Sequence, residues 1–123
     1  MDKIDLKIRT KQFAVDTIRF INELPKSKAN DVISYQIIKS STSVAANYRA
    51  ALRGRSTAEF VSKLNIVLEE SDESNFWYEI IQETNETIDT LKLKQLLNES
   101  NELTAIFASS LKTARNNIKN AKS

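Results

Sequence analysis

A chain of 123 residues, 41% of them hydrophobic, is long enough for one domain with a modest core, and we expect residues 1–123 to form it. One glycine and one proline argue against strands joined by tight turns, and the absence of cysteine excludes a disulfide framework. Charges interrupt every apolar run before it could span a membrane, and the start at Met1 does not resemble a signal peptide. We therefore expect a cytoplasmic protein with no membrane partner.

The net charge of +2 hides a strong segregation of charges along the chain. Residues 1–58 carry a net charge of +6, residues 59–102 carry −8, and residues 103–123 carry +4. Such a distribution says more about partners than the total charge does.

The first predicted helix shows its apolar positions at Phe13, Thr17, Phe20 and Leu24, which share one face at helical spacing. Pro25 predicts that this helix ends near Leu24, because the residue before a proline is pushed out of helical geometry.

The second predicted helix begins at a cap formed by Ser27 or Asn30. Its apolar face runs from Ile33 to Ala51, and Gly54, the only glycine, stands where a helix stop is needed. Asn47 lies near this face, and we expect a buried amide there that fixes the helix register.

The third predicted helix opens with Ser56 and Glu59, which form the pattern of a capping box. Its main apolar face includes Leu64. A second apolar set, which points elsewhere, consists of Ile66, Trp77 and Ile80. A helix with two apolar faces packs in two directions. We therefore predict that this second set forms an oligomer interface.

The fourth predicted helix follows a connection over residues 85–91 and runs from about Leu93 toward the C-terminus. Four helices with short connections predict an all-α, antiparallel, up-down-up-down four-helix bundle. We further expect this bundle to form a ring-like homo-oligomer, because the opposite charges on different segments can pair around a ring whose closed cyclic interface joins unlike surfaces.

This topology brings the end of the second helix, the start of the third and the end of the fourth together. We name the cations that meet there the basic end, and they are Arg49, Arg53, Arg55, Lys112, Arg115 and Lys119. The opposite end is expected to collect Glu79, Glu83, Glu86, Asp89, Glu99 and Glu102. Basic side chains can bind a phosphate backbone without reading its sequence. The alternative is that they complement helix dipoles and form a solvated surface.

Residues for catalysis are lacking. The chain has no histidine for general base chemistry, no cysteine nucleophile and no glycine-rich phosphate loop. Glu69 and Glu73 stand four residues apart on a helix, yet bundle metal sites use a Glu-x-x-His pattern, which favours a solvated acidic face. We predict no catalytic residue, no metal, no cofactor and no small-molecule substrate.

A set of short motifs extends over nearly the whole chain. They are Leu24-Pro25, Gln36-Ile37 with Ser40, the run Ser43 to Arg49, Arg53 with Ser56, Glu59-Phe60, Lys63-Leu64, the run Ile66 to Glu73, and Phe76-Trp77. Together they resemble the four-helix-bundle proteins encoded in intervening sequences of bacterial 23S rRNA genes, to which retroelement accessory variability proteins are similar. The resemblance implies a four-helix protomer, a homopentameric ring and a link to RNA.

These observations predict a non-enzymatic, oligomeric interaction protein whose partners are copies of itself and RNA or another nucleic acid. The alternative is a structural or protein-binding scaffold without a nucleic-acid role.

Overall fold

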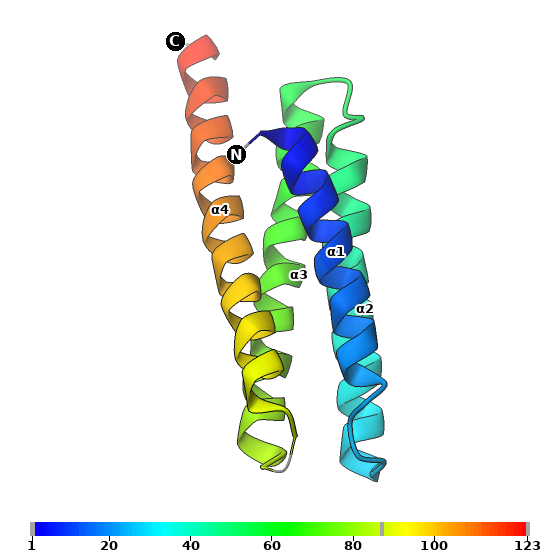
Figure 1. Ribbon diagram of the computed structural model, residues 1–123. Helices are drawn as coiled ribbons and strands as arrows, with labels where there is room; N and C mark the ends of the chain where they lie inside the picture. The colour runs from blue at the N-terminus through cyan, green and yellow to red at the C-terminus, as the bar shows by residue number, and fades with distance from the viewer. Residues whose placement is uncertain (1, 87, 123) are drawn as a thin grey trace.

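The computed structural model describes residues 2–86 and 88–122, which form four helices. They are α1 (Lys3–Ile21), α2 (Lys28–Ala51), α3 (Thr57–Thr84) and α4 (Thr90–Lys122). The helices run alternately up and down, each packs on the next, and α4 returns to α1 (Figure 1). The all-α antiparallel bundle expected from the sequence is therefore confirmed, and the described residues contain no strand.

The first helix ends three residues before the predicted position. Ile21 is its last residue, and the N–H groups of Glu23 and Leu24 donate to carbonyls three residues earlier, at 3.1 Å each. This tight turn precedes Pro25. Of the two predicted caps for α2, Ser27 is the one used, because its hydroxyl accepts the N–H of Asn30 at 3.0 Å.

The turn between α2 and α3 uses Gly54 for a reason that differs from the predicted helix stop. No described glycine has a positive φ, so Gly54 is not a left-handed cap. A Cβ at this position would instead lie 3.1 Å from the carbonyl oxygen of Ala51 and 3.3 Å from the nitrogen of Phe60. Glycine thus permits a close approach of two backbone segments. The predicted cap at Ser56 is confirmed, because its hydroxyl accepts the N–H of Glu59 at 3.1 Å. The reciprocal bond of the predicted capping box differs, because the Glu59 carboxylate accepts the N–H of Arg55 at 2.6 Å.

The last helix begins earlier than predicted, at Thr90. One carboxylate oxygen of Asp89 accepts the N–H groups of Leu91 and Lys92 at 3.1 Å each, which supplies the missing partners of the first turn. Of the predicted connection over residues 85–91, Thr87 lies outside the described residues.

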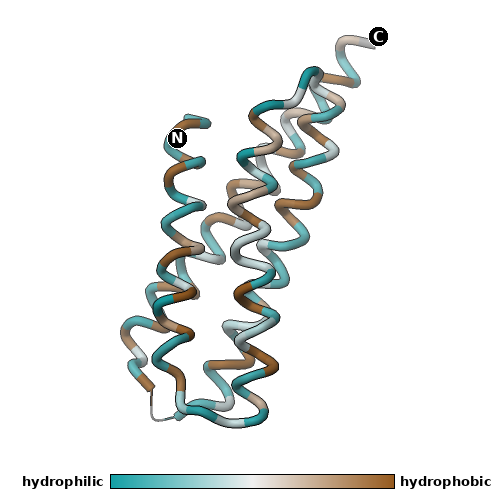
Figure 2. Tube along the Cα trace, turned by 90° about the vertical axis from the view of Figure 1, so that its right-hand side faces the viewer, coloured by the Kyte–Doolittle hydropathy of each residue, from teal (hydrophilic) through white to brown (hydrophobic). Residues whose placement is uncertain are grey.

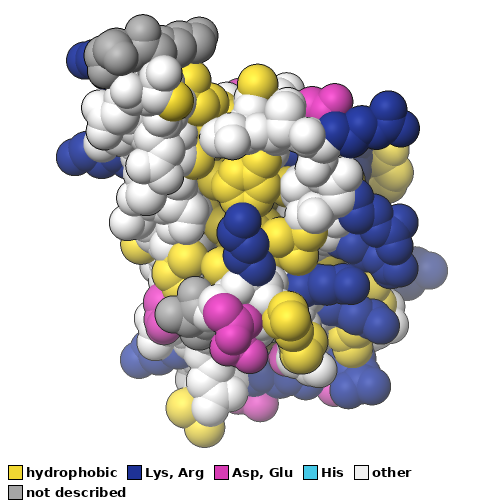
Figure 3. Space-filling view, turned by 90° about the horizontal axis from the view of Figure 1, so that it is seen from above, with side chains coloured by type: hydrophobic (Ala, Val, Ile, Leu, Met, Phe, Trp, Pro, Cys, Tyr) yellow, Lys and Arg dark blue, Asp and Glu magenta, His cyan; other side chains and the backbone are white. Residues whose placement is uncertain are grey.

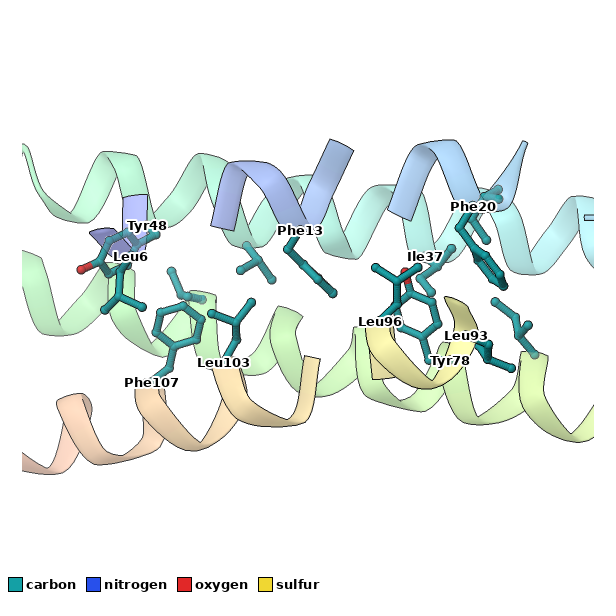
Figure 4. Close-up of a cluster of buried hydrophobic side chains, with 14 of the residues drawn as sticks. Leu6, Phe13, Phe20, Ile37, Tyr48, Tyr78, Leu93, Leu96, Leu103 and Phe107 are labelled. Atoms are coloured by element: carbon teal, nitrogen blue, oxygen red, sulfur yellow. The ribbon is translucent and has the colours of Figure 1, made fainter. Parts of the chain in front are cut away.

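The core lies along the bundle axis, where the apolar faces of all four helices meet (Figures 2 and 4). Figure 2 shows hydrophobic positions recurring along each helix between hydrophilic ones, as the predicted spacing requires. The completely buried residues include Ile37, Leu64, Tyr78, Leu103 and Phe107. None of the helices in the described part of the chain combines the length and apolar composition needed to cross a lipid bilayer.

Polar pairs cross this core and align the helices with one another. Ser40 of α2 lies 2.9 Å from Ser74 of α3, oxygen to oxygen. Asn75 of α3 donates to Thr104 of α4 at 3.0 Å. Because buried polar groups need partners, each pair favours one register of its helices.

Asn47 does not have the predicted register-fixing role. It is half-buried, and its amide donates to the carbonyl and the hydroxyl of Ser43 in the same helix, at 3.0 and 2.8 Å. Asn30 and Asn85 join two helix ends instead, because their side-chain amides exchange hydrogen bonds of 2.9 and 3.2 Å.

Candidate functional site

The six residues of the basic end all belong to the end of the bundle where both termini lie. The last turn of α2, the turn before α3 and the C-terminal part of α4 lie at this end, and the last turns of α4 extend beyond the other helices (Figure 1). All six side chains are exposed. Viewed from this end, hydrophobic side chains occupy the centre of the face, and Lys and Arg side chains gather around it, most densely on the side of α1 and α2 (Figure 3).

The structure divides these six residues into two groups. Arg49 and Arg53 belong to the last turn of α2 and the residues after it, and Arg55 lies in the following turn. The cations of α4 lie on a helix that is diagonal to α2 in the bundle. Within that group, Arg115 turns toward α3 and donates to the side-chain oxygen of Asn65 at 2.7 Å.

The arginines of the first group have no ion-pair partner among the described residues. Arg9 shows the contrast, because it binds Glu99 through Nε at 2.8 Å and Glu102 through Nη2 at 2.9 Å. The hydrogen bond to Glu99 is the main reason that the pKa of Arg9 is raised. Glu99 and Glu102 therefore belong to an α1–α4 ion-pair network and not to the acidic cluster predicted for the end opposite the basic end.

A cavity of about 650 Å³ opens at the same end of the bundle. It is lined by residues of α1, α2, the α2–α3 turn, α3 and α4, and they include Lys3, Tyr48, Arg55, Phe60 and Ser110. The Nζ atom of Lys3 lies 4.6 Å from the centre of the Phe60 ring, which is a cation–π contact. Lys112, Arg115 and Lys119 are absent from the described lining. This cavity was not predicted from the sequence, since its walls come from three stretches of the chain, residues 3–6, 48–60 and 109–117, that are far apart in sequence.

The hydroxyl of Tyr48 is notable within this cavity. Tyr48 is only 2% exposed, and its hydroxyl has no hydrogen-bond partner among the described residues. Burial, followed by the nearby carboxylate of Asp2, raises the pKa of Tyr48. The hydroxyl therefore stays protonated at neutral pH and is available both to donate and to accept.

The second apolar set predicted for the third helix lies on α3, and we name it the apolar α3 face. The protomer covers this face only partly. Ile66, Trp77 and Ile80 are all half-buried. The indole Nε1 of Trp77 is buried and has no hydrogen-bond partner among the described residues. Phe76 lies beside it with its ring edge-on at 4.9 Å and is 50% exposed. Phe76 was not among the residues predicted for this face, although its position next to Trp77 in the sequence was a usable signal.

Acidic side chains flank this face. Glu70 is half-buried, and its pKa is raised, chiefly by burial and then by the charge of Glu73, while Lys39 acts in the opposite direction. Within residues 2–86 and 88–122, no group of three or more His, Cys, Asp or Glu side chains is placed to hold a metal ion.

Comparison with other proteins identifies the family. Residues 2–109 match the family described as 23S rRNA-intervening sequence protein. The chain is also similar to the crystal structure of a protein of unknown function from the S23 ribosomal protein family of Bacteroides thetaiotaomicron, with a TM-score of 0.80 and 33% identity. That similarity covers 91% of this chain and 99% of the other. No curated protein matches the sequence. The chain therefore belongs to the 23S rRNA-intervening sequence protein family.

Proposed function

We propose that this protein is a non-enzymatic, homo-oligomeric interaction protein of the cytoplasm that binds RNA through the basic end. The observation that carries the proposal is that the side chains of Arg49, Arg53 and Arg55 are exposed and form no ion pair with a described carboxylate. Cations that are not neutralised within the protein are free to replace the counterions of a phosphate backbone.

The helix dipole accounts for only part of this arrangement. Arg49 and Arg53 lie at the C-terminal end of α2, where a cation is favourable. Arg55 directly precedes the N-cap of α3, where the helix dipole disfavours a cation, and the Glu59 carboxylate in the first turn, which accepts the N–H of Arg55 at 2.6 Å, offsets part of this cost. A phosphate ligand would give the charge of Arg55 a partner, which supports the nucleic-acid proposal over the alternative of a solvated surface.

The assembly proposal has a different basis. A buried indole N–H without a partner costs free energy, and an aromatic side chain as exposed as Phe76 adds apolar area to the same face. A neighbouring protomer would cover Phe76 and offer Trp77 an acceptor. The resemblance implies a homopentameric ring, and a ring repeats the basic end, which raises the avidity for one long nucleic acid.

The RNA proposal is tested by charge reversal. A variant carrying Arg49→Glu, Arg53→Glu and Arg55→Glu is compared with one carrying Lys26→Glu, Lys28→Glu and Lys94→Glu, whose positions are exposed and lie away from the basic end. Filter binding to structured RNA is measured over a salt series, with circular dichroism as the folding control. We expect loss of binding only in the first variant. In the wild type, a plot of the logarithm of the binding constant against the logarithm of the salt concentration should fall with a slope of ~0.7–0.9 for each phosphate contact.

Two results would contradict this proposal. Absence of RNA binding by the wild type at low salt would leave a protein-binding scaffold as the function. Unchanged binding by the folded arginine variant would move the site to Lys112, Arg115 and Lys119.

The assembly proposal is tested by light scattering on Phe76→Glu. Leu91→Glu is the control, since Leu91 is 67% exposed and lies outside the apolar α3 face. We expect the wild type and Leu91→Glu to be oligomers and Phe76→Glu to have a lower mass. A monomeric wild type at micromolar concentration would contradict the proposal.

A further inference from the structure

The cavity at the basic end has a polar interior that the fold itself does not use. Tyr48 is almost completely buried, lines the cavity, and has no hydrogen-bond partner for its hydroxyl among the described residues. In the close-up, this hydroxyl points along the bundle axis, away from the core residue Phe13 (Figure 4). The Tyr48 hydroxyl lies at the open volume and is not one of the described buried polar atoms without a partner, so it is free to bond a water molecule or a ligand there.

The remaining walls combine apolar and hydrogen-bonding surfaces. Leu6, Leu52 and Phe60 contribute apolar side chains from three different segments. The face of α4 that lines the cavity is polar and includes Ser110 and Asn117. A volume of about 650 Å³ lies within the range of small-molecule sites, which is roughly 300–1,000 Å³.

The edge of the cavity carries positive charge from independent sources. Lys3 is held over the Phe60 ring and has no ion pair with a described carboxylate. Arg55 lines the same cavity, and α3 begins there with Thr57. The first N–H groups of a helix have no intrahelical acceptor and favour an anion. No carboxylate is among the described lining residues, but two lie beside the cavity: Glu59 in the first turn of α3 accepts the N–H of Arg55 at 2.6 Å, and the charge of Asp2 contributes to the raised pKa of Tyr48.

We propose that this cavity binds a small organic phosphate monoester. The phosphate lies at the start of α3, between Lys3 and Arg55, and the ring of the ligand lies against Phe60 with a polar edge toward the Tyr48 hydroxyl. The inference goes beyond the proposed function and does not depend on RNA binding. A free phosphorylated metabolite and the terminal phosphate of a nucleic-acid strand share this chemistry.

Isothermal titration calorimetry on the full chain tests the proposal with phenyl phosphate, adenosine 5′-monophosphate, inorganic phosphate and adenosine. We expect both monoesters to bind more tightly than inorganic phosphate or adenosine, because only they meet both parts of the site. Competition between 5′-phosphorylated and 5′-hydroxyl oligonucleotides for the cavity distinguishes a free phosphorylated metabolite from the terminal phosphate of a strand. Preference for the phosphorylated strand over the free monoesters assigns the site to a strand end.

Substitutions localise the binding. Lys3→Gln and Arg55→Gln should each weaken monoester binding roughly tenfold, since each removes a charged hydrogen-bond donor. Lys7→Gln is the matched control, because Lys7 stands on the same helix, is exposed and does not line the cavity. Tyr48→Phe should weaken binding about three- to tenfold by removing one hydroxyl. Ser110→Leu, which fills the cavity, should abolish binding.

The proposal is overturned if neither monoester binds at millimolar concentration, or if the folded Ser110→Leu variant binds as the wild type does. If Ser110→Leu does not fold, equal losses of monoester affinity in Lys3→Gln and Lys7→Gln would also overturn the proposal. The RNA proposal fails separately. A protein that binds monoesters but no RNA refutes only RNA binding, and one that binds RNA but no monoester refutes only the cavity site.

Discussion

The hydroxyls of Thr17 and Tyr78 lie 2.6 Å apart in the centre of the bundle and join two helices, α1 and α3, that face each other across the diagonal. Both residues have no exposed surface. Burial raises the pKa of Tyr78, while the hydrogen bond from Thr17 acts in the opposite direction. Each hydroxyl is therefore the hydrogen-bond partner of the other, which lowers the free-energy cost of burying both.

We expect Thr17→Val to destabilise the protein by about 1–3 kcal/mol, because it leaves the Tyr78 hydroxyl buried without this partner. The double variant Thr17→Val, Tyr78→Phe should lose less free energy of unfolding than the two single variants lose together, because it leaves no buried hydroxyl without a partner. Denaturant unfolding at one protein concentration measures the four free energies. Additive losses would show that the hydroxyl pair contributes no coupling.

Leu64→Ala should cost ~2–5 kcal/mol, because Leu64 is completely buried in the main apolar face of α3 and its truncation leaves a cavity. Lys112→Ala serves as the surface comparison, since Lys112 is exposed, and it should change stability by less than about 0.5 kcal/mol. The melting temperatures of both variants and of the wild type test this expectation. Equal shifts would show that the apolar face of α3 has been assigned wrongly.

The fold was predictable because helical periodicity and caps are local properties of the sequence. Leu64 and Tyr78 share a face by spacing alone, and Ser56 with Glu59 marks the start of α3. The end of α1 at Ile21 was missed because two i→i−3 hydrogen bonds close the chain before Pro25, and such a turn has no strong sequence signal.

The candidate site was predictable only in part. Topology places the ends of α2 and α4 together, so the basic end followed from helix order. The cavity depends on how closely α4 approaches α1 and α2, which sequence spacing does not determine, and it joins Lys3, Tyr48 and Ser110 from distant parts of the chain. The unpartnered indole of Trp77 depends on the three-dimensional surroundings of that side chain and likewise has no sequence signal.

Gly54→Ala is expected to destabilise the protein by about 1 kcal/mol. An added methyl normally stabilises a loop by restricting the unfolded chain, by about 0.4–1 kcal/mol. Here the new Cβ would lie 3.1 Å from the Ala51 oxygen and 3.3 Å from the Phe60 nitrogen, and backbone atoms that close a turn shift only at a cost. Denaturant unfolding measures the difference. A gain in stability would show that the α2–α3 turn relaxes freely.

Glu70→Gln should stabilise the protein at pH 7 and lose that effect in acid. The folded-state pKa of Glu70 is raised above its ordinary value of 4.5 by burial and by Glu73, so the folded protein binds this proton more tightly than the unfolded chain does. The charged form therefore costs stability above the folded-state pKa, and this cost disappears as the pH falls below about 4.5. Near the surface the gain should stay below about 1 kcal/mol. Melting temperatures from pH 3.5 to 7.5, with Glu79→Gln as the exposed control, test this expectation. A lower melting temperature for Glu70→Gln at pH 7 would mean that attraction to Lys39 outweighs burial and repulsion from Glu73.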